Sequence, residues 1–319
     1  MKLRRKEKAN VQTYSGNKKS TMRLLKKNWV LYLFLLPAVL YLILFKYVPM
    51  YGIQIAFKDY SLAKGYWDSP WVGLKWFVKF FNTPRVWMLL KNTIFISLYS
   101  AIAGFPLPII FAFILNNVKN LKWKKFAQTI TYMPHFISTV VLVGMISIFF
   151  SPNSGIINTI LKFFGGPGDI YFMGSNDYFI HLYVWTGIWQ GIGWGSIIYM
   201  AALSSVDQSL HEAAMIDGAN KIQRVLHIDL PSITPTISIM LIMRLGSILG
   251  VGYEKIYLMQ NSLNIGASEV ISTYVYKLGL LQQQFSYSTA IGLANNVVNL
   301  ILLVAANKIV GKLSGSSLW

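Results

Sequence analysis

Residues 212–218 read Glu-Ala-Ala-Met-Ile-Asp-Gly, and after nine intervening residues 228–231 read Ile-Asp-Leu-Pro. This stretch lies between two apolar segments, each long enough to cross a bilayer. An ordinary interhelical turn is the simplest interpretation, but such turns have about 2–8 residues. The polar connection 204–231 is much longer than that. The sequence therefore predicts a helix–turn–helix segment between two membrane spans, exposed to a cytoplasmic partner.

Local signals place two short helices in this segment. Ser209 and Glu212 have the spacing of a capping box, and Gly218 can adopt the left-handed conformation that ends a helix. Asn220 with Gln223 is predicted to open the second helix, and Pro231 suits the start of the next span.

The first predicted helix also has the surface of a contact site. Ala213 and Ala214 allow close approach, while Glu212 and Asp217 add negative charge for a partner to recognise.

Composition indicates an all-α integral membrane protein. The chain is 54% hydrophobic and only 13% charged, whereas soluble domains carry about 25% charged residues. A basic tail is expected at 1–28 and a membrane domain at 29–319, without a signal-peptide cleavage site after the first apolar stretch. Six membrane-spanning helices are predicted, at 29–50, 92–116, 127–150, 179–203, 232–253 and 288–310.

The distribution of positive charge predicts the orientation. With the N-terminus inside, 18 of the 29 Lys and Arg residues are cytoplasmic, 10 are external, and Arg244 lies within a span. This bias places both termini in the cytoplasm. Because the charges flank membrane segments, they favour contact with membrane lipid over nucleic acid. The chain has no cysteine, which excludes disulfides and thiolate metal sites.

Several residues are candidates for a solute path. Trp185 and Trp189 share one face of the fourth span, and aromatic rings can stack on sugars. Gln190, Asn295 and Asn299 can hydrogen-bond hydroxyl groups. Alternatively, the tryptophans anchor the helix at the interface and the asparagines join helices. Glycines recur every four residues in two of the predicted spans, and this spacing predicts close helix packing. They are Gly187, Gly191 and Gly195 in the fourth span, and Gly246 and Gly250 in the fifth.

Arg244 is predicted about 18 Å into the fifth span, at a rise of about 1.5 Å per residue. A guanidinium there needs a cavity, carbonyl groups or a carboxylate. The nearest acid in sequence is Glu254, too far for a pair within one helix. A structural anchor is therefore favoured over attraction of an anionic sugar. Lys277, in the predicted external segment 254–287, is expected to make only weak surface pairs.

The residues from Glu212 to Pro231 resemble the EAA loop of permease subunits from binding-protein-dependent ATP-binding-cassette (ABC) importers. Tyr132-Met-Pro-His-Phe-Ile-Ser-Thr139 and Leu313-Ser-Gly-Ser-Ser-Leu-Trp319 are similar to the carbohydrate branch. Within it, the chain looks most like oligosaccharide permeases grouped with the lipoprotein-associated LplB type. The resemblance implies a six-helix permease bundle with a cytoplasmic coupling helix, in a bacterial cell membrane.

The resemblance also implies partners. Glu212, Ala213, Ala214, Asp217 and Gly218 would form the coupling helix that docks one of two cytoplasmic ATPase subunits. A second permease subunit, expected to be a different but related chain, would complete the pore, and an extracytoplasmic binding protein would deliver an oligosaccharide. The chain has no phosphate-cradling motif, so ATP and Mg are expected on the partner ATPase.

Two other functions remain as alternatives. A secondary transporter or channel would be favoured by acids in mid-span, and a membrane enzyme by clustered acids or histidines. The sequence has no acid in mid-span, and its four histidines are scattered. We therefore expect no catalytic residue, no bound cofactor and no metal site on this chain.

Overall fold

The computed structural model describes residues 26–315 and 317–318. The predicted basic tail 1–28 therefore lies almost entirely outside the described residues, as do positions 316 and 319 of the C-terminal motif. The chain divides into two compact units. The first ends at Gln54, and the second begins at Ile55.

The described part of the first unit is mainly one apolar helix. α2 (Trp29–Leu42) continues through a π-helical turn (Ile43–Tyr47) into α3 (Val48–Met50), and a 3₁₀ turn (Tyr51–Phe57) follows. Its 29 residues from Trp29 to Phe57 have a mean hydropathy of 2.1. A helix that is apolar on every side is typical of a membrane span.

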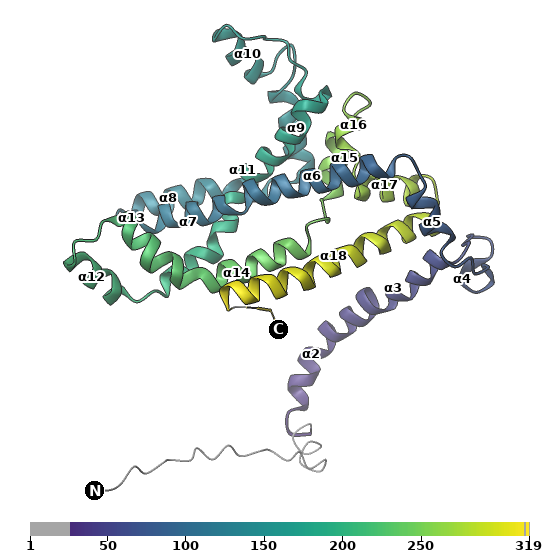
Figure 1. Cartoon of the computed structure of the whole chain (residues 1–319), viewed down its shortest axis with the longest axis horizontal. Coiled ribbons are helices and arrows are strands. Elements are labelled where there is room, and N and C mark those ends of the chain that lie inside the picture. Colours follow the sequence, from purple (N-terminus) through teal and green to yellow (C-terminus); the bar gives the residue numbers. More distant parts are fainter. Residues whose placement is uncertain (1–25, 316, 319) are drawn as a thin grey trace. The chain divides into compact units, whose positions relative to one another are not determined.

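The second unit is built around long helices that pack in pairs. α7 (Pro106–Asn116) lies against α11 (Asn176–Ser204), and α14 (Leu230–Gly246) lies against α18 (Phe285–Ser314) (Figure 1). The remaining α-helices are α4 (Gly65–Asp68), α5 (Lys75–Phe81), α6 (Val86–Gly104), α8 (Leu121–Tyr132), α9 (Thr139–Phe149), α10 (Ile156–Phe163), α12 (Gln208–Ile216), α13 (Lys221–Arg224), α15 (Tyr253–Met259), α16 (Ile265–Ser268) and α17 (Ile271–Tyr276).

Four helices in the described part of the chain are long and apolar enough to cross a membrane. They are Trp29–Phe57, Val86–Asn116, Lys221–Gly246 and Phe285–Ser314, and a bent pair over 121–149 would make a fifth. α11 has 29 residues but falls short of the same hydropathy, because glycines and polar aromatic residues interrupt its apolar surface. The expected all-α membrane architecture is thus present.

The predicted span 127–150 is wrong as a continuous helix. α8 with its 3₁₀ turn Met133–Phe136 is bent by 100° relative to α9, and the break between them is Ile137 and Ser138. Pro134 lacks a backbone donor and disfavours helical backbone before it. Ser138 then caps α9, since its side chain accepts a hydrogen bond from the backbone N–H of Val141 at 3.3 Å.

The structure also differs from the prediction after the middle of the fifth span, where the end of that span and an external segment were expected. α14 ends at Gly246, inside the predicted span 232–253. Residues 253–281 then form α15, α16, α17 and a π-helical turn (Lys277–Leu281). Ile256, Met259 and Val270 of this region are fully buried in the hydrophobic core. The region 253–281 is therefore part of the packed bundle.

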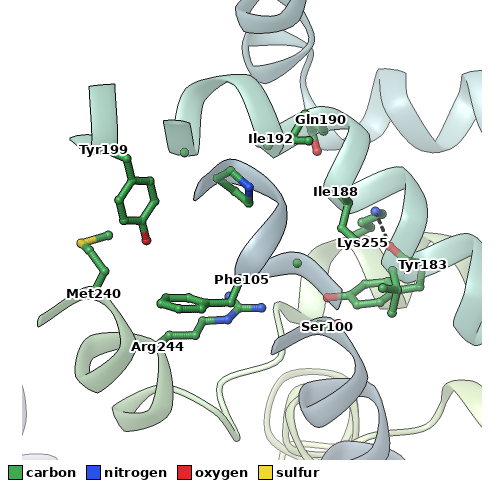
Figure 2. Close-up of a pocket in the computed structure, with 16 residues that line it drawn as sticks. Ser100, Phe105, Tyr183, Ile188, Gln190, Ile192, Tyr199, Met240, Arg244 and Lys255 are labelled. Atoms are coloured by element: carbon green, nitrogen blue, oxygen red, sulfur yellow. Dashed lines mark hydrogen bonds between the residues drawn. The ribbon is translucent and has the colours of Figure 1, made fainter. Parts of the chain in front are cut away.

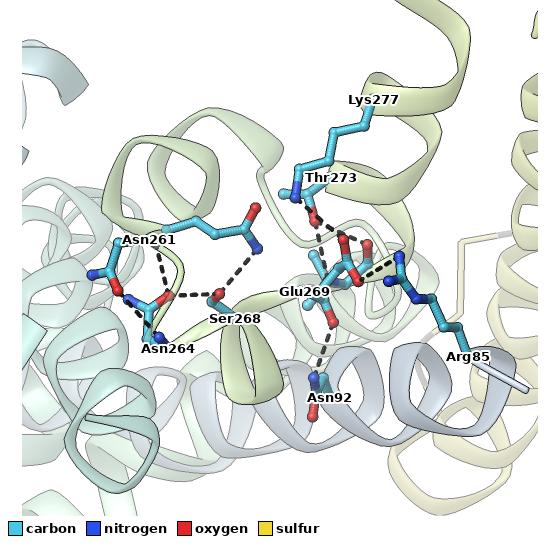
Figure 3. A network of polar contacts seen from close by, with 10 residues as sticks. Arg85, Asn92, Asn261, Asn264, Ser268, Glu269, Thr273 and Lys277 are labelled. Carbon is cyan, nitrogen blue, oxygen red and sulfur yellow. Dashed lines mark hydrogen bonds and ion pairs between the residues drawn. The ribbon is translucent and has the colours of Figure 1, made fainter. Parts of the chain in front are cut away.

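A buried carboxylate fastens this region to the rest of the bundle (Figure 3). Glu269 is 4% exposed, and its Oε1 atom lies 3.2 Å from Lys277 Nζ. Arg85 Nη1, at the start of α6, lies 4.0 Å from Oε2. Asn92 Nδ2 donates to the backbone carbonyl of Glu269 at 3.0 Å. The prediction that Lys277 makes only weak surface pairs is therefore wrong, because its partner is buried.

We expect Lys277→Leu to lower thermal stability clearly more than Lys75→Leu. Removing one partner of a buried pair costs about 3–5 kcal/mol, although the 24% exposure of Lys277 reduces that figure. Lys75 pairs with Asp59 at 2.9 Å, but both side chains are about half exposed, and such pairs contribute about 0–1 kcal/mol. Thermal unfolding of the detergent-purified chains measures both. Equal shifts in unfolding temperature would show that the pair of Lys277 with Glu269 stabilises the chain no more than the exposed pair does.

Candidate functional site

The segment after α11 forms two short helices, but its first cap is not the predicted one. α12 begins at Gln208, and Asp207 caps it by accepting a hydrogen bond from the backbone N–H of Ser209 at 2.9 Å. The hydrogen bonds from Ser209 lower the pKa of the Asp207 carboxyl. The predicted capping box of Ser209 with Glu212 is wrong, because the chain is still extended at Asp207 and turns helical immediately after it.

The turn between the two helices is as predicted. Gly218 has φ +80°, and the backbone N–H of Ala219 donates to the carbonyl of Ala214 at 2.8 Å. Asn220 and Gln223 form a reciprocal capping box at the start of α13. These local contacts confirm the predicted turn at Gly218 and the predicted start of the second helix.

The outer surface of α12 is accessible in this chain. Glu212, Ala213 and Asp217 lie on its surface, and all three are exposed. Beside them Ile216 is 87% exposed and Met215 is 52% exposed. Large apolar side chains grouped on an otherwise polar surface are typical of a docking site.

A contact that sequence reasoning missed attaches α12 to the following helix. His211 Nε2 lies 3.1 Å from Asp229 Oδ1, and the Asp229 side chain is only 3% exposed. Asp229 immediately precedes α14. The only available signal was the acid within the Ile-Asp-Leu-Pro sequence, and nothing in the sequence paired it with a histidine 18 positions earlier.

A cavity of about 380 Å³ lies among α6, α7, α11, α14 and α15 (Figure 2). It brings together two predicted solute-path residues, Gln190 and Arg244, and two residues that were not predicted, Tyr183 and Lys255. Gln190 Nε2 donates to the carbonyl of Ile137 at 2.8 Å, so its amide also supports the bend before α9. The lining also includes Ser100, Gly104, Phe105, Pro108, Val184, Gly187, Ile188, Gly191, Ile192, Gly195, Tyr199 and Met240.

The glycine stripe on α11 makes room for this cavity. Gly187, Gly191 and Gly195 all line it, and a Cβ atom on Gly191 would meet nothing within 4 Å. Within the stripe the predicted close helix approach occurs at Gly195, whose added Cβ atom would lie 3.3 Å from Pro108 of α7. A closer approach occurs at Gly193, outside the stripe, where a Cβ atom would collide with the carbonyl oxygen of Thr131. On the fifth span the expectation holds for Gly246, whose added Cβ would collide with Leu303 of α18.

Two cations face the cavity without a carboxylate among its lining residues. Lys255 Nζ donates to the carbonyl of Tyr183 and to Thr186 Oγ1, each at 2.9 Å. Arg244 is exposed, and within the described residues its side chain has no hydrogen bond or ion pair. Glu254 lies elsewhere, where it accepts a hydrogen bond from Thr139 at 3.3 Å. The cavity therefore carries uncompensated positive charge.

The other predicted path residues lie outside this cavity. Trp185 and Trp189 line a separate apolar groove with Phe150 and Phe172. Asn299 Oδ1 accepts a hydrogen bond from the backbone N–H of Leu249 at 3.1 Å, which fits the alternative that it joins helices.

A helical membrane bundle with a charged cavity and an exposed helical loop between two spans defines a transport protein. Residues 104–314 match the family of binding-protein-dependent transport system inner membrane components, and the chain belongs to this family. The family is one of transport permeases, and its members are not enzymes.

Similar proteins and structures extend over nearly the whole chain. Protein LplB of Bacillus subtilis (strain 168) is 43% identical over 305 residues, which cover 96% of each chain. The polygalacturonan/rhamnogalacturonan transport system permease protein YteP of the same strain is 42% identical, over 95% of this chain and 94% of that protein.

A solved bacterial ABC transporter for the acidic polysaccharide alginate contains a chain that is 37% identical. The TM-score is 0.84, with 92% of this chain and 99% of that chain covered. The alginate transporter in complex with its alginate pentasaccharide-bound periplasmic protein matches with a TM-score of 0.85 and 37% identity, over 93% and 99% of the two chains.

Proposed function

We propose that this chain is a permease subunit of an ATP-driven importer and forms half of a path for oligosaccharides that carry carboxylates. Its partners are a second, related permease, an extracytoplasmic solute-binding protein and two cytoplasmic ATPases that bind ATP and Mg. The chain lies in a bacterial cell membrane with both termini in the cytoplasm. The relatives named above for polygalacturonan, rhamnogalacturonan and alginate support the substrate class.

The pair of cations in the cavity is the main support for an acidic substrate. A guanidinium within a membrane segment is costly unless a cavity, a carbonyl group or an anion receives it. Within the described residues the Arg244 side chain has no anchoring partner, and Lys255 forms no ion pair. A uronate carboxylate would supply the missing charge and could accept two hydrogen bonds from the guanidinium. This argument favours the anionic solute over the structural anchor expected from the sequence.

The attachment of α12 to α14 supports the proposed coupling to an ATPase. α12 presents Glu212 and Ile216 to a partner. The contact between His211 and Asp229 ties α12 to the start of α14, and α14 carries Arg244 near its far end. A displacement of α12 by a closing ATPase would therefore move α14 as a body and change the cavity.

Gly191→Leu tests the path directly, because it places a larger side chain at the wall of the cavity. The residue lies inside α11, and its added Cβ has open space. We expect a loss of sugar uptake of about tenfold or more, with unchanged abundance in the membrane. Gly144→Leu is a matched control, since Gly144 also lies in a helix with open space but does not line the cavity. Normal uptake by Gly191→Leu would exclude this cavity from the path.

A further inference from the structure

We infer that a second cavity, bounded by Tyr253, Tyr276, Asn295 and Asn296, is a subsite for an uncharged part of a sugar ring and is used by longer oligosaccharides. This inference rests on the proposed function, because it assumes a saccharide in the first cavity. It gives a role to Asn295, which the first cavity does not contain.

The cavity has the size and position of a ligand site. Its volume is about 440 Å³, within the range of about 300–1,000 Å³ that is usual for small-molecule pockets. α15, α17, the π-helical turn after α17 and α18 surround it. It is lined by Tyr253, Ile271, Ser272, Val275, Tyr276, Gly279, Leu280, Phe285, Ser288, Gly292, Asn295 and Asn296, and these include no charged residue.

The aromatic wall of the cavity is held in place. The rings of Tyr253 and Tyr276 stack with centroids 5.1 Å apart and planes 22° apart. Tyr257 packs edge-on against Tyr276 at 5.0 Å, which fixes Tyr276 from a second direction. Tyr253 is still 47% exposed, so part of its ring remains free. A tyrosine ring offers an apolar face for the C–H groups of a pyranose and a hydroxyl for its oxygens.

The amides opposite the tyrosines are unusual for their position. Asn295 and Asn296 lie about 15 Å along α18 from its first residue, at a rise of about 1.5 Å per residue. Asn296 is exposed, and Asn295 Oδ1 is a buried atom without a hydrogen-bond partner within the described residues. Exposed amides are expensive in hydrocarbon. Sugar hydroxyls both donate and accept, so they can satisfy amide groups of this kind, whereas an acyl chain cannot.

A small third cavity adjoins the first cavity. Its volume is about 110 Å³, and Tyr183 and Arg244 line both it and the first cavity. Gly252 also lines the third cavity, and the next residue in the chain, Tyr253, lines the second cavity. A saccharide with its carboxylate at Arg244 can therefore extend along the break between α14 and α15. Only a chain of several sugar units would occupy both subsites.

Gly292→Leu tests the second subsite. Gly292 lines the second cavity inside α18, and its added Cβ would meet nothing within 4 Å, so a larger side chain begins in open space at the cavity. Proteoliposomes with the complete importer and its binding protein are given a mixture of oligogalacturonides and maltooligosaccharides of different lengths. Mass spectrometry then measures which lengths accumulate inside. Asn296→Leu serves as a second variant that replaces an amide and not a glycine, and Gly144→Leu is the control.

We expect Gly292→Leu to reduce accumulation of the longer oligosaccharides about fivefold, as expected for the loss of one stacking and hydrogen-bonding subsite. Accumulation of disaccharides should remain at the level of Gly144→Leu, and Asn296→Leu should shift the length profile in the same direction. An unchanged length profile in Gly292→Leu would overturn the subsite while leaving the proposed function intact. Loss of all lengths in Gly191→Leu but a normal profile in Gly292→Leu would likewise exclude the second cavity as a subsite. No accumulation of any sugar by the wild-type importer would contradict both proposals.

Discussion

Gly218→Pro and Glu212→Lys are expected to abolish the stimulation of ATP hydrolysis by the loaded binding protein, while the chain remains near wild-type abundance in the membrane. Gly218 has φ +80°, and its N–H donates to the carbonyl of Met215 at 3.1 Å. Proline fixes φ near −65° and removes the donor, so the turn between α12 and α13 cannot form. Glu212 lies on the surface of α12 and is not buried, so reversal of its charge affects a partner surface rather than the core.

Three quantities measure this effect: membrane abundance, co-purification of the ATPase and stimulated hydrolysis. Gly165→Pro is a matched control, because Gly165 has φ +79° in the loop after α10 and its N–H donates to the carbonyl of Lys162 at 3.1 Å. The same strain is thus introduced far from the coupling segment in the sequence. Normal stimulated hydrolysis in both coupling variants would show that residues 212–218 do not transmit the signal.

Arg244→Gln should reduce uptake of uronate oligosaccharides about 30-fold or more and spare neutral ones. Removal of one partner from a desolvated charge pair costs about 2–5 kcal/mol. Arg244→Lys keeps the charge but loses the planar fork of donors, so an intermediate effect is expected. Uptake of oligogalacturonides and maltooligosaccharides at matched abundance provides the comparison. Equal losses for acidic and neutral sugars would mean that Arg244 serves the structure of the bundle and not recognition of a carboxylate.

The local structure of the coupling segment could be predicted because adjacent residues determine it. Gly218, Asn220 and Gln223 act through turns and caps within a few positions of one another, and the structure has them as expected. The cap at Asp207 was missed because Ser209 offered a competing capping-box spacing two residues later. The bend near Pro134 was missed for a similar reason, since the apolar residues on both sides suggested one continuous span.

The cavity could be predicted only in part, since it depends on contacts between distant segments. Helical spacing placed Trp185 and Trp189 on one face of α11, and both line one groove, but the spacing could not show which face of α11 lines the cavity. Lys255 reaches Tyr183 across 72 positions of the sequence. Glu269 meets Arg85, which is much farther away along the chain. Such pairs have no local signature.

The central claim is that movement of the coupling segment drives passage of sugar through the first cavity. Sugar uptake and ATP hydrolysis measured together, in the same proteoliposomes, test it most directly. We expect Gly218→Pro to lose both stimulated hydrolysis and uptake, and Gly191→Leu to lose uptake although it still binds the ATPase. Normal uptake and hydrolysis in Gly218→Pro, or normal uptake in Gly191→Leu, would contradict this account of how the chain works.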